Sequence, residues 1–229
     1  SKPAGMQNVT DLEKIQIIKE VLEEGSYESL KPVNDPLYYT PYIISSISTL
    51  KREGFPVPRF RQLVSILKDE FEIEKEELNK TTFAERQKQV NKNLDLLDIY
   101  EKYQTKLSEI GRFDFDDMVN WVVESFETDS DFLLSYQEKF QYILVDEYQD
   151  TNSSQNRLIF SLASFWGLEA NLFAVGDQNQ SIYRFQGASK ENLIQFKNLF
   201  PNHTKITLTE NYRSTKTVLN LSAKLLNEE

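Results

Sequence analysis

The sequence predicts an α/β protein in which a helical subdomain precedes a partial parallel sheet flanked by helices. From residue 142 onward, an apolar segment, a polar motif and an amphipathic helix follow one another three times. This alternation is typical of parallel sheets. Before residue 113, helical periodicities succeed one another with no strand pattern between them. We therefore predict two parts, residues 1–112 and residues 113–229.

The composition narrows the class of protein. The 229 residues include no cysteine, which excludes a disulfide framework and fits a cytoplasmic protein. No apolar run approaches the roughly 20 residues of a membrane span, and the N-terminus lacks the layout of a signal peptide, so we expect no membrane contact. The net charge of −10 disfavours nucleic-acid binding by charge alone. Any contact with a phosphate backbone must therefore come from a local groove.

Four helices are predicted before residue 112, separated by glycines and prolines. They cover about residues 11–24, about residues 39–52, a stretch after Pro58 that includes Leu67, and about residues 83–110. The apolar face of the first should hold Leu12, Ile15, Ile18 and Leu22, and that of the last should include Val90, Leu94, Leu97, Tyr100, Tyr103, Leu107 and Ile110. The alternative for the last helix is a coiled-coil partner, but we favour the core of a small helical domain.

Three aspartates, Asp114, Asp116 and Asp117, open the next helix. Acidic side chains in a first turn complement the helix dipole and bind the free N–H groups there. A chemical role is the alternative. We interpret these residues as helix caps, because adjacent carboxylates at a helix start are common.

Residues 142–150 organise the second part. Four apolar residues predict a buried strand of a parallel sheet, and Asp146 and Glu147 follow it directly. Ligands of open α/β sheets bind beyond the carboxyl ends of the strands, so these carboxylates should lie where a nucleotide binds. One can hold Mg²⁺ while its neighbour orients an attacking water. The alternative is an acidic turn that caps the next helix, but the further Gln149 and Asp150 favour chemistry.

Two more strands are predicted, at residues 172–175 and 206–208, each followed by a polar motif. The motif after the first contains Gln180, which can contact a phosphate, and Tyr183 and Phe185, which can stack on bases or else pack in the core. The motif after the second contains Arg213, which can stabilise a transferring phosphoryl group or else lie on the surface. Right-handed crossovers would place all three motifs at one edge of the sheet, which predicts one composite nucleotide site.

These motifs resemble those of superfamily 1 DNA helicases of the UvrD/Rep/PcrA family. Asp-Glu-Tyr-Gln-Asp at residues 146–150 matches motif II, residues 176–188 match motif III, and Asn-Tyr-Arg-Ser at residues 211–214 matches motif IV. Asp-Phe-Asp-Asp-Met at residues 114–118 resembles the segment that leads out of the family's helical insertion. The resemblance implies that residues 1–112 are this insertion, usually called 1B, and that the remainder is part of the first RecA-like ATPase domain, 1A, of the P-loop NTPase type.

The resemblance also implies a function and a role for each site residue. The whole protein would be an ATP-dependent 3′–5′ DNA helicase that translocates on single-stranded DNA and unwinds duplexes at single-strand/duplex junctions, in DNA repair or recombination. Asp146 would bind Mg²⁺, and Glu147 would activate the water that attacks ATP. Gln180 and Arg213 would contact the γ-phosphate, and Tyr212 would stack on adenine. The DNA contacts would come from two aromatic residues, Tyr183 and Phe185.

One part of such an ATPase is missing from the sequence. A Walker A motif needs Gly-Lys-Ser/Thr, and none of the seven glycines is followed by lysine. By the resemblance, the P-loop lies upstream and a second RecA-like domain completes the helicase, so we expect this chain alone to release no phosphate from ATP. The alternative is a DNA-binding or scaffolding subunit of a repair complex that has no P-loop. An upstream coding sequence for Gly-Lys-Thr would distinguish the two.

Overall fold

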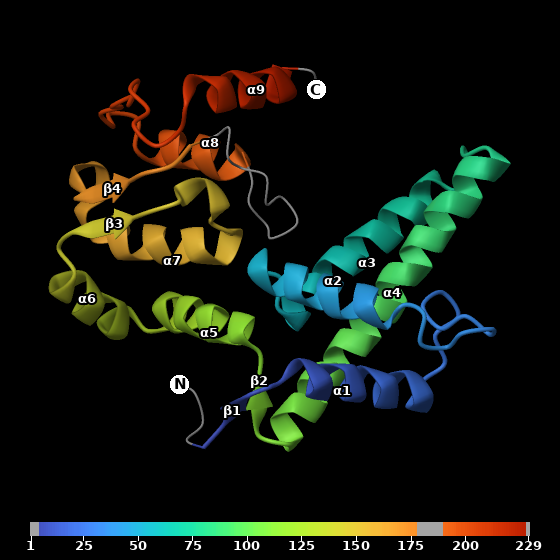
Figure 1. The fold of residues 1–229 in the computed structure, drawn as a ribbon. Helices are drawn as coiled ribbons and strands as arrows, with labels where there is room; N and C mark the ends of the chain where they lie inside the picture. The colour runs from blue at the N-terminus through green and yellow to red at the C-terminus, as the bar shows by residue number, and fades with distance from the viewer. Residues whose placement is uncertain (1–4, 178–189, 228–229) are drawn as a thin grey trace.

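The computed structural model describes residues 5–177 and 190–227 (Figure 1). In chain order its elements are β1 (Gln7–Asn8), α1 (Asp11–Glu24), α2 (Thr40–Arg52), α3 (Val57–Glu74), α4 (Lys80–Glu109), β2 (Arg112–Phe113), α5 (Phe115–Thr128), α6 (Ser130–Lys139), β3 (Ile143–Val145), the 3₁₀ turn η1 (Tyr148–Asp150), α7 (Ser153–Ala163), the 3₁₀ segment η2 (Ser164–Glu169), β4 (Leu172–Ala174), α8 (Lys190–Leu199) and α9 (Lys216–Asn227). The fold is mostly helical with two small parallel sheets, which is consistent with a partial RecA-like α/β fold. None of the helices in the described ranges combines the length and apolar character of a membrane span.

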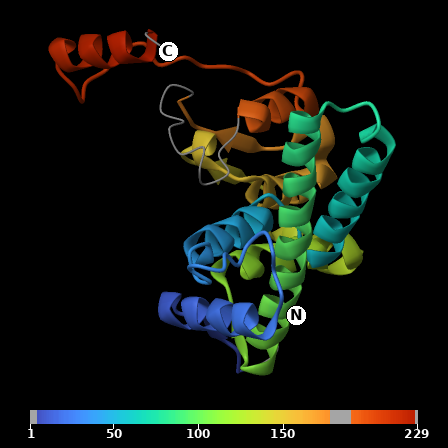
Figure 2. The same cartoon turned by 90° about the vertical axis from the view of Figure 1, so that its right-hand side faces the viewer.

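The helical part has a core in which α1, α2 and α4 meet. Val21 and Leu22 of α1, Ile43 of α2 and Ile99 of α4 are all fully buried in it. Each such side chain contributes about 1.5–3 kcal/mol to folding through burial. Beyond this core, α3 and α4 run side by side as a long projection (Figure 1). α9, by contrast, stands apart from the other helices (Figure 2).

The predicted apolar face of α1 is only partly right. Ile18 and Leu22 are buried as predicted, but Leu12 is 80% exposed. Ile17 and Val21 are buried in addition. Apolar residues recur so densely on this helix that two stripes are possible, and packing against α2 and α4 selects one of them.

In α4 the predicted stripe is largely right, since Val90, Tyr103 and Leu107 are buried. Leu94 and Ile110 are exposed, although both were placed on the apolar face. Leu96 and Ile99 are buried instead, beside the correctly predicted Tyr100. The helix lies between α1 and α3, so it buries a wider band than a single stripe.

Two of the three aspartates at the start of α5, Asp114 and Asp117, act as caps, as predicted, whereas Asp116 pairs with Arg52 of α2. The Asp117 Oδ2 atom accepts a hydrogen bond from the Asp114 N–H at 2.8 Å, within a capping box. Both carboxylates are also buried beside Lys51 of α2, which is only 1% exposed. Lys51 Nζ lies 2.6 Å from Asp114 Oδ2 and 2.8 Å from Asp117 Oδ1. We call Lys51, Asp114 and Asp117 the Lys51 cluster.

The Lys51 cluster holds the helical part against the second part of the chain. Burial by itself would raise the pKa of the Asp114 carboxyl, but the charges and hydrogen bonds of Lys51 and Lys14 hold that pKa below its ordinary value. Gln104 of α4 accepts a hydrogen bond from Lys51 Nζ at 2.9 Å. Tyr103 donates to the Asp114 carboxylate at 3.0 Å. The buried charges are therefore paired and hydrogen-bonded, as charges inside a protein must be.

The second part contains the parallel pair β3–β4. Ile143 lies opposite Leu172 and Val145 lies opposite Ala174, and α7 lies between the two strands in the chain. α7 packs against α5 and α6. This strand–helix–strand arrangement is the one predicted for residues 142–175.

Two predictions for this sheet are wrong. Residues 206–208 form no strand, and Ile206 and Leu208 are 76% and 86% exposed. β3 is present but is not buried on both faces, since Leu144 is 75% exposed. A strand needs the free edge of another strand, and a parallel sheet needs cover on both faces. In the described part of the chain, β3 and β4 pair only with each other, and residues 206–208 do not pair with the free edge of either strand.

Candidate nucleotide site

The turn after β3 carries Asp146 and Glu147, and both side chains are exposed. The N–H of Val175 donates to the Val145 carbonyl, and the N–H of Tyr148 donates to the Val175 carbonyl, each at 2.9 Å. These bonds fix the turn to the end of β4. Glu147 has φ +49° and ψ +42°, a left-handed conformation that costs a non-glycine residue about 1–2 kcal/mol. Such strain is found most often at functional sites.

Gln149 connects the two strand ends. Its buried side-chain amide donates from Nε2 to Glu147 Oε2 at 2.7 Å and accepts at Oε1 from the Asp177 N–H at 3.0 Å. The Glu147 carboxylate is therefore held by a side chain that also fixes the start of the next motif. The sequence predicts no separate role for Gln149. The only sequence feature that marks this residue is its amide side chain between carboxylates.

Gly176 allows Gln149 to approach this closely. A Cβ atom built on Gly176 would lie 2.7 Å from Gln149 Oε1 and 3.2 Å from the Gln149 backbone nitrogen. We expect Gly176→Ala to lower the free energy of unfolding by about 1–3 kcal/mol, as overpacking does, and to displace the amide from Glu147. Urea denaturation of the full-length protein measures this. When Gln149 is already replaced by alanine, Gly176→Ala should lower the free energy of unfolding less. An equal loss with and without Gln149 would contradict the inference that Gly176 makes room for the Gln149 side chain.

Two further residues secure the turn from behind. Tyr148 is buried, which raises its pKa, and its ring meets that of Phe196 on α8 edge-on with the centroids 5.4 Å apart. Thr151 Oγ1 donates to the Tyr148 carbonyl at 2.7 Å, and Asn156 Nδ2 of α7 donates to Thr151 Oγ1 at 2.9 Å. The turn is thus held between α7 and α8.

The donor set at this turn fits Mg²⁺ and a nucleotide. Mg²⁺ prefers oxygen ligands and is commonly held in ATP sites by one or two carboxylates together with phosphate oxygens and water. Asp146 and Glu147 supply adjacent exposed carboxylates. No group of three or more metal-binding side chains exists in residues 5–177 and 190–227, so the protein offers no closed cage there. Asp150 Oδ1 is buried with no hydrogen-bond partner in the described part of the chain, which leaves an acceptor free beside the turn.

A family comparison identifies the kind of domain to which this turn belongs. The family described as UvrD/REP helicase N-terminal domain matches residues 6–201. The chain belongs to this family. The match covers both the helical part and the turn with its two carboxylates, which confirms the family predicted from motifs II, III and IV.

Relatives of this UvrD/REP domain bear names that describe helicases. The protein named ATP-dependent DNA helicase PcrA from Staphylococcus aureus (strain Mu50) is 44% identical over 128 residues, which is 56% of this chain and 17% of that protein. The protein of the same name from Bacillus subtilis (strain 168) is 43% identical over 129 residues, with the same shares. The aligned region therefore spans less than a fifth of either relative.

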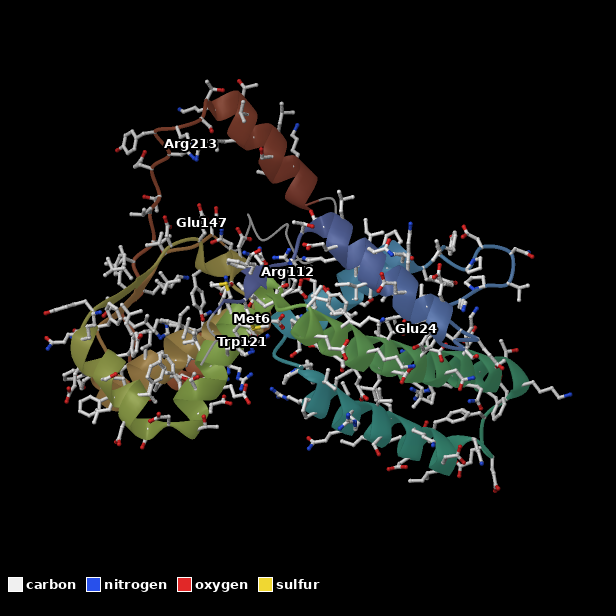
Figure 3. All side chains as sticks on the ribbon, turned by 90° about the horizontal axis from the view of Figure 1, so that it is seen from below. Met6, Glu24, Arg112, Trp121, Glu147 and Arg213 are labelled. Carbon is white, nitrogen blue, oxygen red and sulfur yellow. The ribbon has the colours of Figure 1, made fainter. Side chains whose placement is uncertain are left out.

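The structure of the UvrD/REP domain places some of the predicted site residues and not others. Asp146 and Glu147 stand together after β3. Tyr212 is 94% exposed and Arg213 is also exposed. Figure 3 shows Arg213 and Glu147 on separate segments, and no hydrogen bond or ion pair found in the described ranges joins them. The remaining three predicted residues, Gln180, Tyr183 and Phe185, lie outside the described residues.

A separate hollow lies away from this turn. Met6, Arg112 and Trp121 are among its lining residues, which come mainly from α4, α5 and the segments beside them (Figure 3). Asp117 lines it, but it contains none of the residues of motifs II, III and IV. The candidate site is therefore the exposed turn at the end of β3 rather than this hollow.

Proposed function

We propose that this chain is part of an ATP-dependent DNA helicase that moves 3′ to 5′ on single-stranded DNA, unwinds duplexes at single-strand/duplex junctions and acts in DNA repair or recombination in the cytoplasm. The observation that carries the proposal is the pair Asp146 and Glu147 at the end of β3, with the Glu147 carboxylate held by Gln149, inside a UvrD/REP domain. In this proposal residues 1–112 are the helical insertion and residues 113–229 belong to the first RecA-like domain. The upstream P-loop segment and the second RecA-like domain are its partners.

Each site residue has a role in this proposal. Asp146 holds Mg²⁺, which neutralises charge on the phosphates of bound ATP. Glu147 accepts a proton from the attacking water, with its carboxylate oriented by Gln149. Arg213 and Gln180 stabilise negative charge on the γ-phosphate. The adenine stacks on Tyr212, whose exposed ring is free to receive it.

Phosphate release by the natural full-length protein, measured with and without single-stranded DNA, tests the ATPase part of this function. We expect hydrolysis that single-stranded DNA stimulates. The second candidate is a DNA-binding or scaffolding subunit of a repair complex. DNA binding without any phosphate release would support that candidate and contradict the helicase proposal.

Tyr183 and Phe185 are proposed to stack on the bases of single-stranded DNA. Replacing either by alanine in the full-length protein should weaken single-strand binding by about 1–3 kcal/mol per ring, since stacking contributes this much for any base. The melting temperature should stay the same. Fluorescence anisotropy with a labelled oligonucleotide measures the affinity, and Phe165→Ala, at an exposed ring on η2, is the matched control. If the rings belong to the core, the melting temperature falls and the affinity per folded molecule does not.

A further inference from the structure

The carboxyl end of α2 lies against the first turn of α7 (Figure 1). Ser153 Oγ donates a hydrogen bond to the Glu53 carboxylate. The buried Ser154 Oγ lies 3.0 Å from the Lys51 carbonyl oxygen. A Cβ atom on Gly54 would lie 2.8 Å from the Arg157 guanidinium, so the two elements are in close contact. Residues of the helical part therefore reach the helix that directly follows motif II.

The start of α7 is tied to the turn that carries Glu147. Only η1 and the cap residues separate this helix from Glu147 along the chain. The N–H of Asp150 donates to the Glu147 carbonyl at 2.9 Å. Asn156 of α7 reaches back to Thr151 at 2.9 Å, and Thr151 in turn bonds to η1. A displacement of the first turn of α7 would therefore displace the turn as well.

The end of α2 is itself a fixed point. Lys51 places its side chain in the Lys51 cluster, and its carbonyl accepts a hydrogen bond from Asn120 Nδ2 of α5 at 2.8 Å. Gln104 of α4 contacts both Lys51 and Asp117. Because α4 and α5 both hold this end of α2, it can serve as a rigid support for α7.

We propose that Glu53 is a positioning residue for motif II, and that its bond to Ser153 sets the position of Glu147. The carboxylate sits at the N-terminus of α7, where the helix dipole favours negative charge. A bond to a charged acceptor is about twice as strong as a neutral one, so this contact adds to those that already hold the turn. The inference rests on the proposed function, because it gives the helical part a role in hydrolysis: it supports the turn that carries the general base.

Hydrogen exchange tests the positioning without relying on hydrolysis. In the full-length protein, Glu53→Ala should make the amides of residues 148–156 exchange on the order of tenfold faster. Ser153→Ala should do the same, and the double variant should add little to either. Glu101→Ala, which removes a 2.8 Å ion pair to Arg61 inside the helical part, is the matched control and should leave these amides unchanged. Unchanged exchange in Glu53→Ala would overturn the proposal.

The proposed role of Glu53 also predicts different effects on kcat and on KM. Glu53→Ala should lower kcat for ATP hydrolysis several-fold and leave KM for ATP unchanged, while Glu53→Gln, which keeps an acceptor for Ser153, should recover part of the loss. A normal kcat in Glu53→Ala would contradict the positioning role. If the unaltered protein releases no phosphate at all, the proposed function fails, and the exchange experiment still decides whether Glu53 positions the turn.

Discussion

Replacing Glu147 by glutamine in the full-length protein is expected to slow ATP hydrolysis by about 10²–10⁴-fold, the usual contribution of a general base. Its carboxylate is exposed at the end of β3 and accepts a hydrogen bond from Gln149 at 2.7 Å, so its position is fixed before a ligand arrives. Glutamine has the same shape and still offers an acceptor to Gln149, but it cannot take a proton from water. ATP binding and the melting temperature should therefore stay close to those of the unaltered protein.

Phosphate release under single-turnover conditions measures this loss, and titration with a fluorescent ATP analogue measures binding. Glu138→Gln, at an exposed position on α6, is the matched control and should hydrolyse ATP at the normal rate. If Glu147→Gln also hydrolysed ATP normally, Glu147 would be only a carboxylate that helps to shape an acidic turn.

The largest expected effect on stability comes from Lys51→Met. Removing one partner of a buried ion pair typically costs about 3–5 kcal/mol, because the remaining charge is left buried without compensation. Here Asp117 would lose its ion pair with Lys51, and Asp114 would keep the partly exposed Lys14, at 3.1 Å, as its ion-pair partner. Urea denaturation of the full-length protein, followed through amide exchange in α2 and α5, gives the change in the free energy of unfolding.

Two controls separate buried charge from lost packing. Lys75→Met, which breaks an exposed pair with Glu72 on α3, should cost no more than about 1 kcal/mol. Adding Asp114→Asn and Asp117→Asn to Lys51→Met should restore much of the lost stability, because no uncompensated charge then remains. If Lys51→Met lowered the free energy of unfolding no more than Lys75→Met does, the Lys51 cluster would not stabilise the contact between the helical part and the second part.

The same cluster predicts a pH dependence. The pKa of Asp114 is lower in the folded protein than its ordinary value of about 3.9. Its carboxylate therefore stabilises the fold at pH values above 3.9, and this contribution is lost as the pH falls through the lower folded pKa. The stability advantage of the unaltered protein over Asp114→Asn should accordingly be constant near neutral pH and shrink in acid. A stability difference between the two proteins that grew in acid would contradict the lowered pKa of Asp114.

Local features of the fold were predictable from sequence because their causes are local. Thr10 caps α1, and the Glu13 carboxylate accepts a hydrogen bond from the Thr10 N–H at 2.8 Å. Asp114 caps α5 for the same reason, since a capping box needs only four consecutive residues. Asp146 was likewise predictable at the end of β3, because an apolar run followed by carboxylates marks the end of a strand.

Tertiary features were not predictable, since they depend on which elements meet. Nothing in the sequence around Lys51 indicates that its ammonium group pairs with Asp114, 63 residues away in the chain. Gln149 could be recognised as a link to Asp177 only once β3 and β4 stood side by side. The strand predicted at residues 206–208 failed for a related reason: a β-branched, apolar segment forms a strand only beside another strand.

Strand separation on a tailed duplex tests the central claim most directly. The full-length protein, given ATP and Mg²⁺, should separate a duplex that carries a 3′ single-stranded tail and should leave a duplex with a 5′ tail intact. Glu147→Gln should bind the same 3′-tailed duplex and separate none of it. Failure of the unaltered protein to separate either duplex, under conditions in which it binds both ATP and DNA, would contradict the account.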